Sequence, residues 1–172
     1  TDINISVEYF RTILKQQAVV NAGIKFKFTD EKENISEEFY YPEGVFGYIK
    51  ELDDSKGFTY PVLLEGTGKG KDRDDKPEYK VKLSFAFCFN NDVNALEYYH
   101  NSSFLEHGGS PDKAVRSAFT SEIDKLVKQR GKYKADESKI TFYDIQDSLI
   151  VVSSSFSTQT SYENQTKKSI SN

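Results

Sequence analysis

The sequence predicts an α+β fold in which a mostly four-stranded sheet is covered on one face by helices. The segment at 80–89 alternates large apolar residues with small or basic ones, which is the period of a strand with one face on a core. The segment at 110–130 instead spaces its apolar residues as a helix does. Hairpin signals between such segments argue against a purely parallel, doubly wound sheet.

The first third of the chain predicts two helices separated by a hairpin. Ser6 is a plausible N-cap and Gly23 a plausible stop for a helix over 6–20. The segments that follow are a strand at 24–28, a charged hairpin tip at 30–34, a returning strand at 37–41 and a short helix carrying Val45, Ile49 and Leu52.

The middle of the chain is less regular. Strands are predicted at 60–65 and 97–103. The Gly-rich segment at 66–77 is interpreted as a mobile, solvated loop, because its charges are of both signs. A contact with a phosphate backbone, or a family-specific insertion, is the sharper alternative. The segment lacks the spacing of a P-loop.

Gly108 and Gly109 precede the longest predicted helix. Free N–H groups there could hold an anion, but a tight turn with positive φ is the favoured interpretation. Ser110 is predicted as the N-cap and Pro111 as the first helical residue. After this helix, a polar linker and a short capped helix lead to an inner strand at 149–152.

Composition sets the outer limits. A chain of 172 residues can bury a core as one domain, 1–172. Its net charge of −4 excludes a generally basic nucleic-acid binder, so DNA contact needs a local basic face. The single cysteine, Cys88, is predicted to be a structural thiol in a reducing cytosol. No apolar run approaches the roughly 20 residues of a membrane span, and no signal peptide is visible, so a cytoplasmic protein without a membrane partner is expected.

Self-contained catalytic chemistry is not predicted. His100 and His107 form no metal-binding spacing with carboxylates and are expected to be surface or loop residues. The serines at 153–157 have no candidate base in the sequence. The chain begins without Met and ends in mid-pattern. It is therefore interpreted as an excised fragment of a larger multidomain chain, without a metal site and inactive by itself.

The most informative motif lies near the C-terminus. Gln165, Thr166 and Lys167 present an amide, a hydroxyl and an ammonium in consecutive positions, a set that suits a polyanion. Three polar residues are usually no more than a solvated loop, so the context decides. The block at 162–168 resembles the Gln-Thr-Lys loop of the B subunits of bacterial type IIA topoisomerases, DNA gyrase and topoisomerase IV.

Further blocks occur in the same order as in that family. They resemble its aromatic strand and Gly turn, its Asn-containing strand ending in Glu-Gly-Gly, the helix that follows and the short helix before the last strand; these are 39–45, 98–109, 114–120 and 144–149. The order is more specific than any single block. Two departures are the insertion of His107 before the glycines and Ser110-Pro111 where the family often has Thr-His.

The resemblance implies a transducer domain, which is the second domain of the ATPase region. Its fold, related to a ribosomal-protein domain, contains a left-handed β-α-β crossover. ATP and Mg²⁺ are then held by an upstream ATPase domain. Lys167 is the implied catalytic residue at the γ-phosphate, and Gln165, Thr166 and Lys167 are the implied cofactor-binding residues. Departure of the phosphate is then relayed to the DNA gate of an ATP-dependent topoisomerase.

The implied partners are the upstream ATPase domain, the A-type subunit and double-stranded DNA. Arg116 resembles an arginine on the family's long helix that lines a basic hole for DNA, and Lys125 and Arg130 could extend that face. Ordinary helix-surface charge is an equal alternative. The full-length enzyme is expected to be a homodimer and the fragment a monomer.

Two rival functions stay open. One is a nucleic-acid-binding module of ribosomal-like fold, which the acidic net charge disfavours. The other is the transducer-like domain of a mismatch-repair or chaperone ATPase, which the block at 162–167 disfavours. The sequence does not choose between gyrase and topoisomerase IV.

Overall fold

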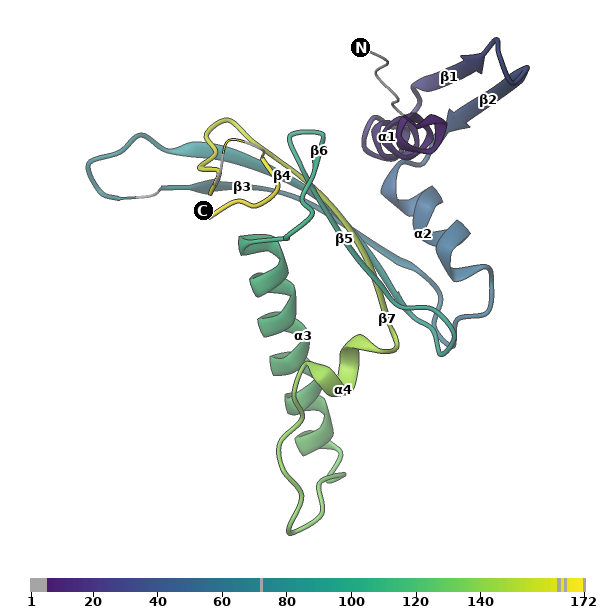
Figure 1. Ribbon diagram of the computed structural model, residues 1–172. Helices are drawn as coiled ribbons and strands as arrows, with labels where there is room; N and C mark the ends of the chain where they lie inside the picture. Colours follow the sequence, from purple (N-terminus) through teal and green to yellow (C-terminus); the bar gives the residue numbers. More distant parts are fainter. Residues whose placement is uncertain (1–5, 72, 164, 166, 172) are drawn as a thin grey trace.

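The computed structural model describes residues 6–71, 73–163, 165 and 167–171. Its elements form a five-stranded sheet of order β3-β4-β7-β5-β6 and a separate two-stranded hairpin, β1-β2 (Figure 1). The helices are α1 (Val7–Val20), α2 (Val45–Asp53), α3 (Ser110–Gln129) and α4 (Tyr143–Gln146). The strands are β1 (Lys25–Asp30), β2 (Ile35–Tyr40), β3 (Val62–Gly70), β4 (Tyr79–Phe89), β5 (Ala95–His100), β6 (Ser103–Phe104) and β7 (Leu149–Ser157).

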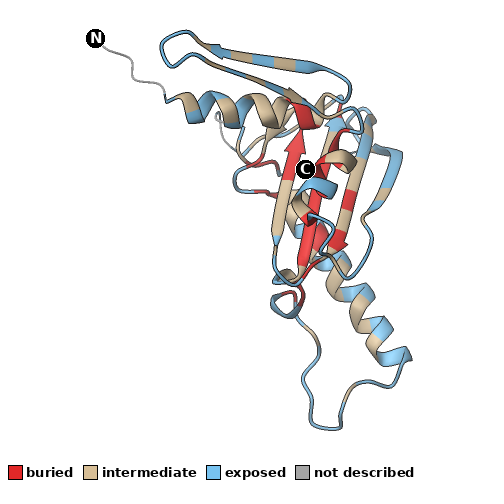
Figure 2. Cartoon of the chain, turned by 90° about the vertical axis from the view of Figure 1, so that its right-hand side faces the viewer, coloured by how far each residue is buried: buried red, intermediate tan, exposed pale blue. Residues whose placement is uncertain are grey.

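The α+β class is confirmed, but two details of the predicted sheet are wrong. The sheet has five strands, because the two-residue strand β6 pairs with β5. Helices also lie on both faces, as the two core clusters show (Figure 2). Ala86 and Cys88 of β4 face α2, while Phe85 and Phe87 pack with the α3 and α4 cluster. The small residues that looked like a solvent face let α2 approach the sheet closely.

One strand pairing is parallel. β5 pairs with β7 in parallel register from Ala95↔Ile150 to His100↔Ser155, and the chain between them passes through β6, α3 and α4. The other pairings in the sheet are antiparallel. The result is a β-α-β crossover in an otherwise antiparallel sheet. Its left hand stays a prediction from the resemblance.

The predicted loop at 66–77 is largely strand. β3 runs to Gly70 and pairs with β4 as far as Gly70↔Tyr79. A Cβ on Gly70 would lie 2.3 Å from the Tyr79 ring, so the glycine makes room for an aromatic ring on the neighbouring strand. The loop prediction is therefore wrong for 66–70, which belong to β3.

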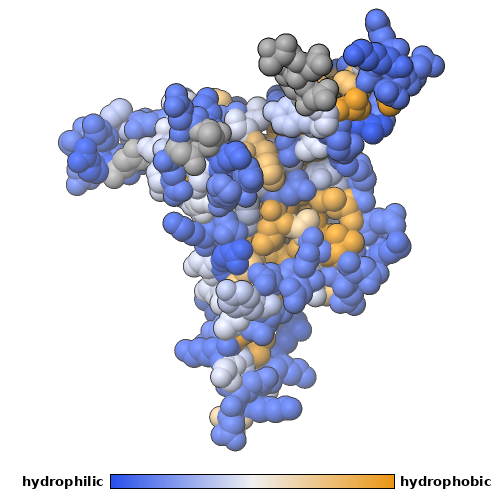
Figure 3. Space-filling view, viewed as in Figure 1, coloured by the Kyte–Doolittle hydropathy of each residue, from blue (hydrophilic) through white to orange (hydrophobic). Residues whose placement is uncertain are grey.

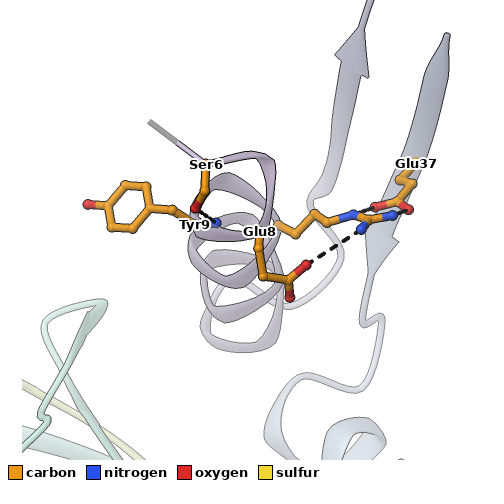
Figure 4. Close-up of polar contacts among 5 residues, drawn as sticks. Ser6, Glu8, Tyr9 and Glu37 are labelled. Carbon is orange, nitrogen blue, oxygen red and sulfur yellow. Dashed lines mark hydrogen bonds and ion pairs between the residues drawn. The ribbon is translucent and has the colours of Figure 1, made fainter. Parts of the chain in front are cut away.

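One local prediction at the edge of the fold is confirmed. Ser6 caps α1, since its Oγ accepts a hydrogen bond from the Tyr9 N–H at 3.2 Å (Figure 4). On the same helix, Arg11 Nε donates to Glu37 Oε2 at 2.7 Å and ties α1 to β2. That contact holds the pKa of the Glu37 carboxyl below its usual value.

Cys88 is buried, as a structural thiol should be. Its Sγ lies 3.7 Å from Asp53 Oδ1 at the end of α2, and Asn90 Nδ2 donates to the same carboxylate at 2.9 Å. Burial, followed by the nearby Asp53 charge, raises the pKa of the thiol to about 12. The group therefore joins α2 to the sheet rather than serving as a nucleophile.

A cavity of about 630 Å³ separates α3 from the sheet. Its walls are mainly apolar side chains of β4 and α3, among them Leu83, Phe85 and Phe119, with Ile170 at one end. Figure 3 shows apolar surface in the angle between α3 and the sheet. Phe119 of α3 also packs against Phe87 of β4, with 5.2 Å between the ring centres, so the helix contacts the sheet beside this cavity as well as at its N-terminal end, where the candidate site lies.

Candidate functional site

The described residues after β7 are 158–163, 165 and 167–171, and we call the segment to which they belong the terminal loop. A bridge joins Tyr162 to Ile170 in antiparallel fashion. The Ser171 N–H donates to the Ser161 carbonyl at 3.0 Å, and the Glu163 N–H donates to the Ser169 carbonyl at 3.0 Å. The described residues between these contacts, Gln165, Lys167 and Lys168, are therefore carried by a small hairpin-like base.

The terminal loop is joined to the start of α3. The Ser110 N–H donates to the Ile170 carbonyl at 2.9 Å, and the His107 N–H donates to the Lys168 carbonyl at 3.0 Å. Lys168 also forms an ion pair with Glu106, which lowers the pKa of that carboxyl. The Glu-His-Gly-Gly segment thus positions the loop by backbone contacts, a role that no local sequence signal indicates.

Gly109 makes this close approach possible. Gly108 and Gly109 have φ of +65° and +81°, so the predicted positive-φ turn is confirmed. A Cβ on Gly109 would lie 2.2 Å from the Ile170 carbonyl oxygen. The predicted N-cap is wrong, because α3 begins at Ser110 with Gly109 as its N-cap, and Ser110 Oγ donates to the Ile170 carbonyl at 3.2 Å.

Gln165 and Lys167 are exposed on the terminal loop. Lys167 has a φ of 57°, and its Nζ lies 5.5 Å from the centre of the Tyr162 ring. Thr166, the third residue of the predicted motif, lies outside the described residues. The loop therefore presents an ammonium and an amide to solvent, donors that suit a phosphate group.

His100 lies at the base of the terminal loop. The prediction that it is a surface or loop residue is wrong. It is 4% exposed at the end of β5, and burial lowers the pKa of its imidazole. Its Nδ1 lies 2.8 Å from Ser155 Oγ and its Nε2 lies 2.7 Å from Thr160 Oγ1. One of the serines of β7, Ser155, therefore does have a histidine beside it. No sequence signal could find it, because the pairing of β5 with β7 makes the contact.

The three predicted DNA-binding residues lie along or just after α3, but two are paired with acids of that helix. Arg116 Nε donates to Asp112 Oδ2 at 2.7 Å, and its guanidinium lies 4.6 Å from the centre of the Phe142 ring. Lys125 Nζ lies 2.6 Å from Glu122 Oε1. Arg130 is exposed and has no ion pair with any residue that the structure describes.

Neither a metal centre nor a membrane-spanning helix occurs in the described part of the chain. No three His, Cys, Asp or Glu side chains gather there as a metal centre would require. None of the described helices is long and apolar enough to cross a membrane.

Solved structures share the fold of this chain. It is similar to the 43K ATPase domain of Thermus thermophilus gyrase B in complex with an aminocoumarin, with a TM-score of 0.69 and 24% identity, covering 99% of this chain and 44% of that one. It is equally similar to the B-subunit of the DNA gyrase from Myxococcus xanthus, with a TM-score of 0.69 and 15% identity, covering 97% of this chain and 50% of that one. These likenesses establish a gyrase-type α+β fold.

The sequence itself establishes the family. The family model described as DNA gyrase B matches residues 44–172, so this chain belongs to the DNA gyrase B family. The gyrase B protein of Clostridium acetobutylicum is 27% identical over 161 residues, which are 92% of this chain and 24% of the relative. The gyrase B protein of Mycoplasmoides gallisepticum is 28% identical over 174 residues, 96% of this chain and 27% of the relative. The chain thus spans about a quarter of these relatives.

Proposed function

We propose that this chain is the transducer domain of an ATP-dependent type II DNA topoisomerase and that the terminal loop is its nucleotide contact. The observation that carries the proposal is the display of Gln165 and Lys167 on a loop joined to the start of α3. Membership of the DNA gyrase B family supports it. Residues 1–172 are proposed to act as one unit, which is favoured by the packing of Val19 of α1 with α2 and the sheet.

The chemistry of the loop fits the terminal phosphate of ATP, the proposed substrate. Lys167 offers a point positive charge, and Gln165 offers a neutral N–H donor two residues away. Thr166 is proposed as a third contact. A cation that meets the γ-phosphate stabilises the charge that develops during phosphoryl transfer. The adenine, Mg²⁺ and the general base are assigned to the upstream ATPase domain.

The same contacts provide a route from nucleotide to DNA gate. Loss of the phosphate removes the partner of Lys167 and frees the terminal loop to move. Because the Ser110 N–H at the first turn of α3 donates a hydrogen bond to the Ile170 carbonyl, movement of the terminal loop displaces that helix. Rigid-body rotation is the expected form of the response. The proposed partners are the A-type subunit, double-stranded DNA and a second copy of the full-length chain. The proposed location is the cytoplasm. The chain of 172 residues alone is proposed to be a monomer.

DNA contact is proposed along α3 with Arg130 as its strongest contributor. Arg116 and Lys125 are weaker candidates because each is partly neutralised by an acid of the same helix. The proposed contact is with phosphates only and therefore independent of DNA sequence. A plain nucleic-acid-binding module stays the alternative function. The other alternative, a mismatch-repair or chaperone ATPase, is disfavoured by the family match.

The test uses the full-length protein with Lys167→Ala. Removal of the charge is expected to lower the rate of ATP hydrolysis by about 100-fold or more, while binding of a non-hydrolysable ATP analogue changes by less than about tenfold. Lys32→Ala, which removes an exposed lysine from the distant β1-β2 tip, is the matched control and is expected to retain the rate. Unchanged hydrolysis by Lys167→Ala contradicts the phosphate contact and brings the binding-module alternative forward.

A further inference from the structure

A directed series of hydrogen bonds runs beneath the terminal loop. Ser155 Oγ donates to the Tyr99 carbonyl at 3.2 Å, so its only hydrogen is used and it must accept from His100 Nδ1 at 2.8 Å. Asn101 Nδ2 donates to Thr160 Oγ1 at 3.2 Å. The Thr160 hydroxyl hydrogen is then available for His100 Nε2, which lies 2.7 Å away.

This network assigns the state of the imidazole. The contacts fit a neutral His100 with its hydrogen on Nδ1 and with Nε2 as the acceptor, and burial, which lowers the pKa of the imidazole, favours that state. A proton on Nε2 turns that atom into a donor, so the Thr160 hydroxyl must turn its own hydrogen away from the ring while it still accepts from Asn101 Nδ2. The contact between β5 and the first residues of the terminal loop therefore changes when the imidazole is protonated.

His100 also connects to the tip of the loop. The Tyr162 ring packs edge-on against the imidazole, with 6.3 Å between the ring centres. The Lys167 ammonium lies over the same tyrosine ring, 5.5 Å from its centre. A run of contacts thus leads from the buried histidine through an aromatic ring to the exposed cation.

We propose that His100 is a positioning residue for Lys167: its neutral imidazole holds Thr160 and the Tyr162 ring, and protonation of the imidazole releases them. The inference rests on the proposed function of the terminal loop. Protonation of His100, which does not touch the nucleotide, would then slow ATP hydrolysis at acidic pH.

The direction of the pH effect follows from the surroundings of His100. The groups that face it are the Ser155 and Thr160 hydroxyls, the Asn101 amide by way of Thr160, and the Tyr162 ring. Burial alone lowers the pKa of the imidazole below 6.5. The stabilisation is thus fully present above pH 6.5, declines as the pH falls below that value and is lost once the native imidazole is protonated.

Among the residues that the structure describes, the charged groups nearest to the imidazole are not in direct contact with it. Glu122 of α3 and His100 both line the cavity between the helix and the sheet, and Lys167 reaches His100 only by way of Tyr162. The lowered pKa of the imidazole has burial as its cause rather than a neighbouring charge. Substitution of His100 is therefore expected to change the pH profile without disturbing an ion pair.

The test measures kcat and KM for ATP from pH 5 to 8 in the full-length protein, with His100→Leu, His100→Gln and the exposed-histidine control His107→Gln. Leucine removes both hydrogen bonds, so kcat at pH 7.5 is expected to fall between about tenfold and 100-fold with KM nearly unchanged. Glutamine keeps a neutral polar group near the Nε2 position and is expected to restore most of kcat. It is also expected to remove the acid decline that the wild type and His107→Gln show below pH 6.5.

Two outcomes overturn the proposal. Wild-type kcat in His100→Leu overturns the proposal, and so does an acid decline in His100→Gln equal to that of the wild type. If His100→Leu fails to fold, as circular dichroism would show, the glutamine profile decides alone. Lys167→Ala is assayed in parallel: an effect of Lys167→Ala without any effect at His100 leaves the phosphate contact standing and removes only the role of His100.

Discussion

Replacement of Gly109 by alanine is expected to detach the terminal loop from α3. The added Cβ would lie 2.2 Å from the Ile170 carbonyl oxygen, 2.7 Å from Ser169 Oγ and 2.8 Å from the Ile170 nitrogen. Two of these are backbone atoms, so rotation of a side chain cannot relieve the overlap. The loop must move away, and both hydrogen bonds from Ser110 to the Ile170 carbonyl are lost.

The magnitude follows from two contributions. Gly109 has φ +81° and ψ −136°, a region almost restricted to glycine, where alanine costs about 1 to 3 kcal/mol. Each lost hydrogen bond costs about 1 kcal/mol net. Together they reduce the local stability of the loop contact by about 3 to 5 kcal/mol. Gly131→Ala is the matched control, because Gly131 has φ +58° with no atom within 4 Å of the added Cβ, so only about 1 kcal/mol of backbone strain is expected.

Amide hydrogen exchange of the full-length protein measures the difference. Peptides that cover the start of α3 and the terminal loop are expected to exchange faster in Gly109→Ala than in Gly131→Ala. A difference of about 2 kcal/mol corresponds to about 30-fold. Equal exchange of these peptides in the two variants refutes the reasoning, because both share the strain of positive φ and only Gly109 has the close approach to Ile170.

Two further predictions concern the core and the DNA face. Because the pKa of Cys88 rises from 9.0 to about 12, the native thiol has about 1000-fold less thiolate at pH 8 and is expected to react with a thiol reagent only on unfolding; rapid labelling of the folded protein contradicts this. Arg130→Ala is expected to reduce the salt dependence of DNA binding by about one phosphate contact. Arg116→Ala is expected to reduce it less, because Asp112 already occupies that guanidinium; equal salt slopes for the two variants argue against this ranking.

Local signals predicted the elements well. The helix expected at 6–20 is α1 (Val7–Val20), and the strand expected at 80–89 is β4 (Tyr79–Phe89). Capping by Ser6 and the positive φ of Gly109 were also predictable. Each of these features depends on residues a few positions apart, where the period of the apolar side chains and the conformational limits of one residue decide the outcome.

The arrangement of the elements was less predictable. The expected single covered face was wrong because Ala86 and Cys88 are small rather than strongly apolar, yet α2 packs against them. The end of β3 was missed because glycines at 66–70 indicate a loop, whereas pairing with β4 supplies the backbone partners of a strand. Burial by a distant element overrides a local preference in both cases.

The order of the amino acids was enough to predict the class of fold, the positions of most helices and strands, and the presence of an amide and an ammonium at Gln165 and Lys167. Contacts between distant segments were needed to show that the loop carrying them is joined to the start of α3 through Gly109 and Ile170, and that His100 is buried beneath it. Those contacts join residues far apart in the chain, as the 60-residue separation of Ser110 and Ile170 illustrates. Such pairs meet because β5 and β7 pair in parallel, and a local pattern carries no information about which strand will be the neighbour.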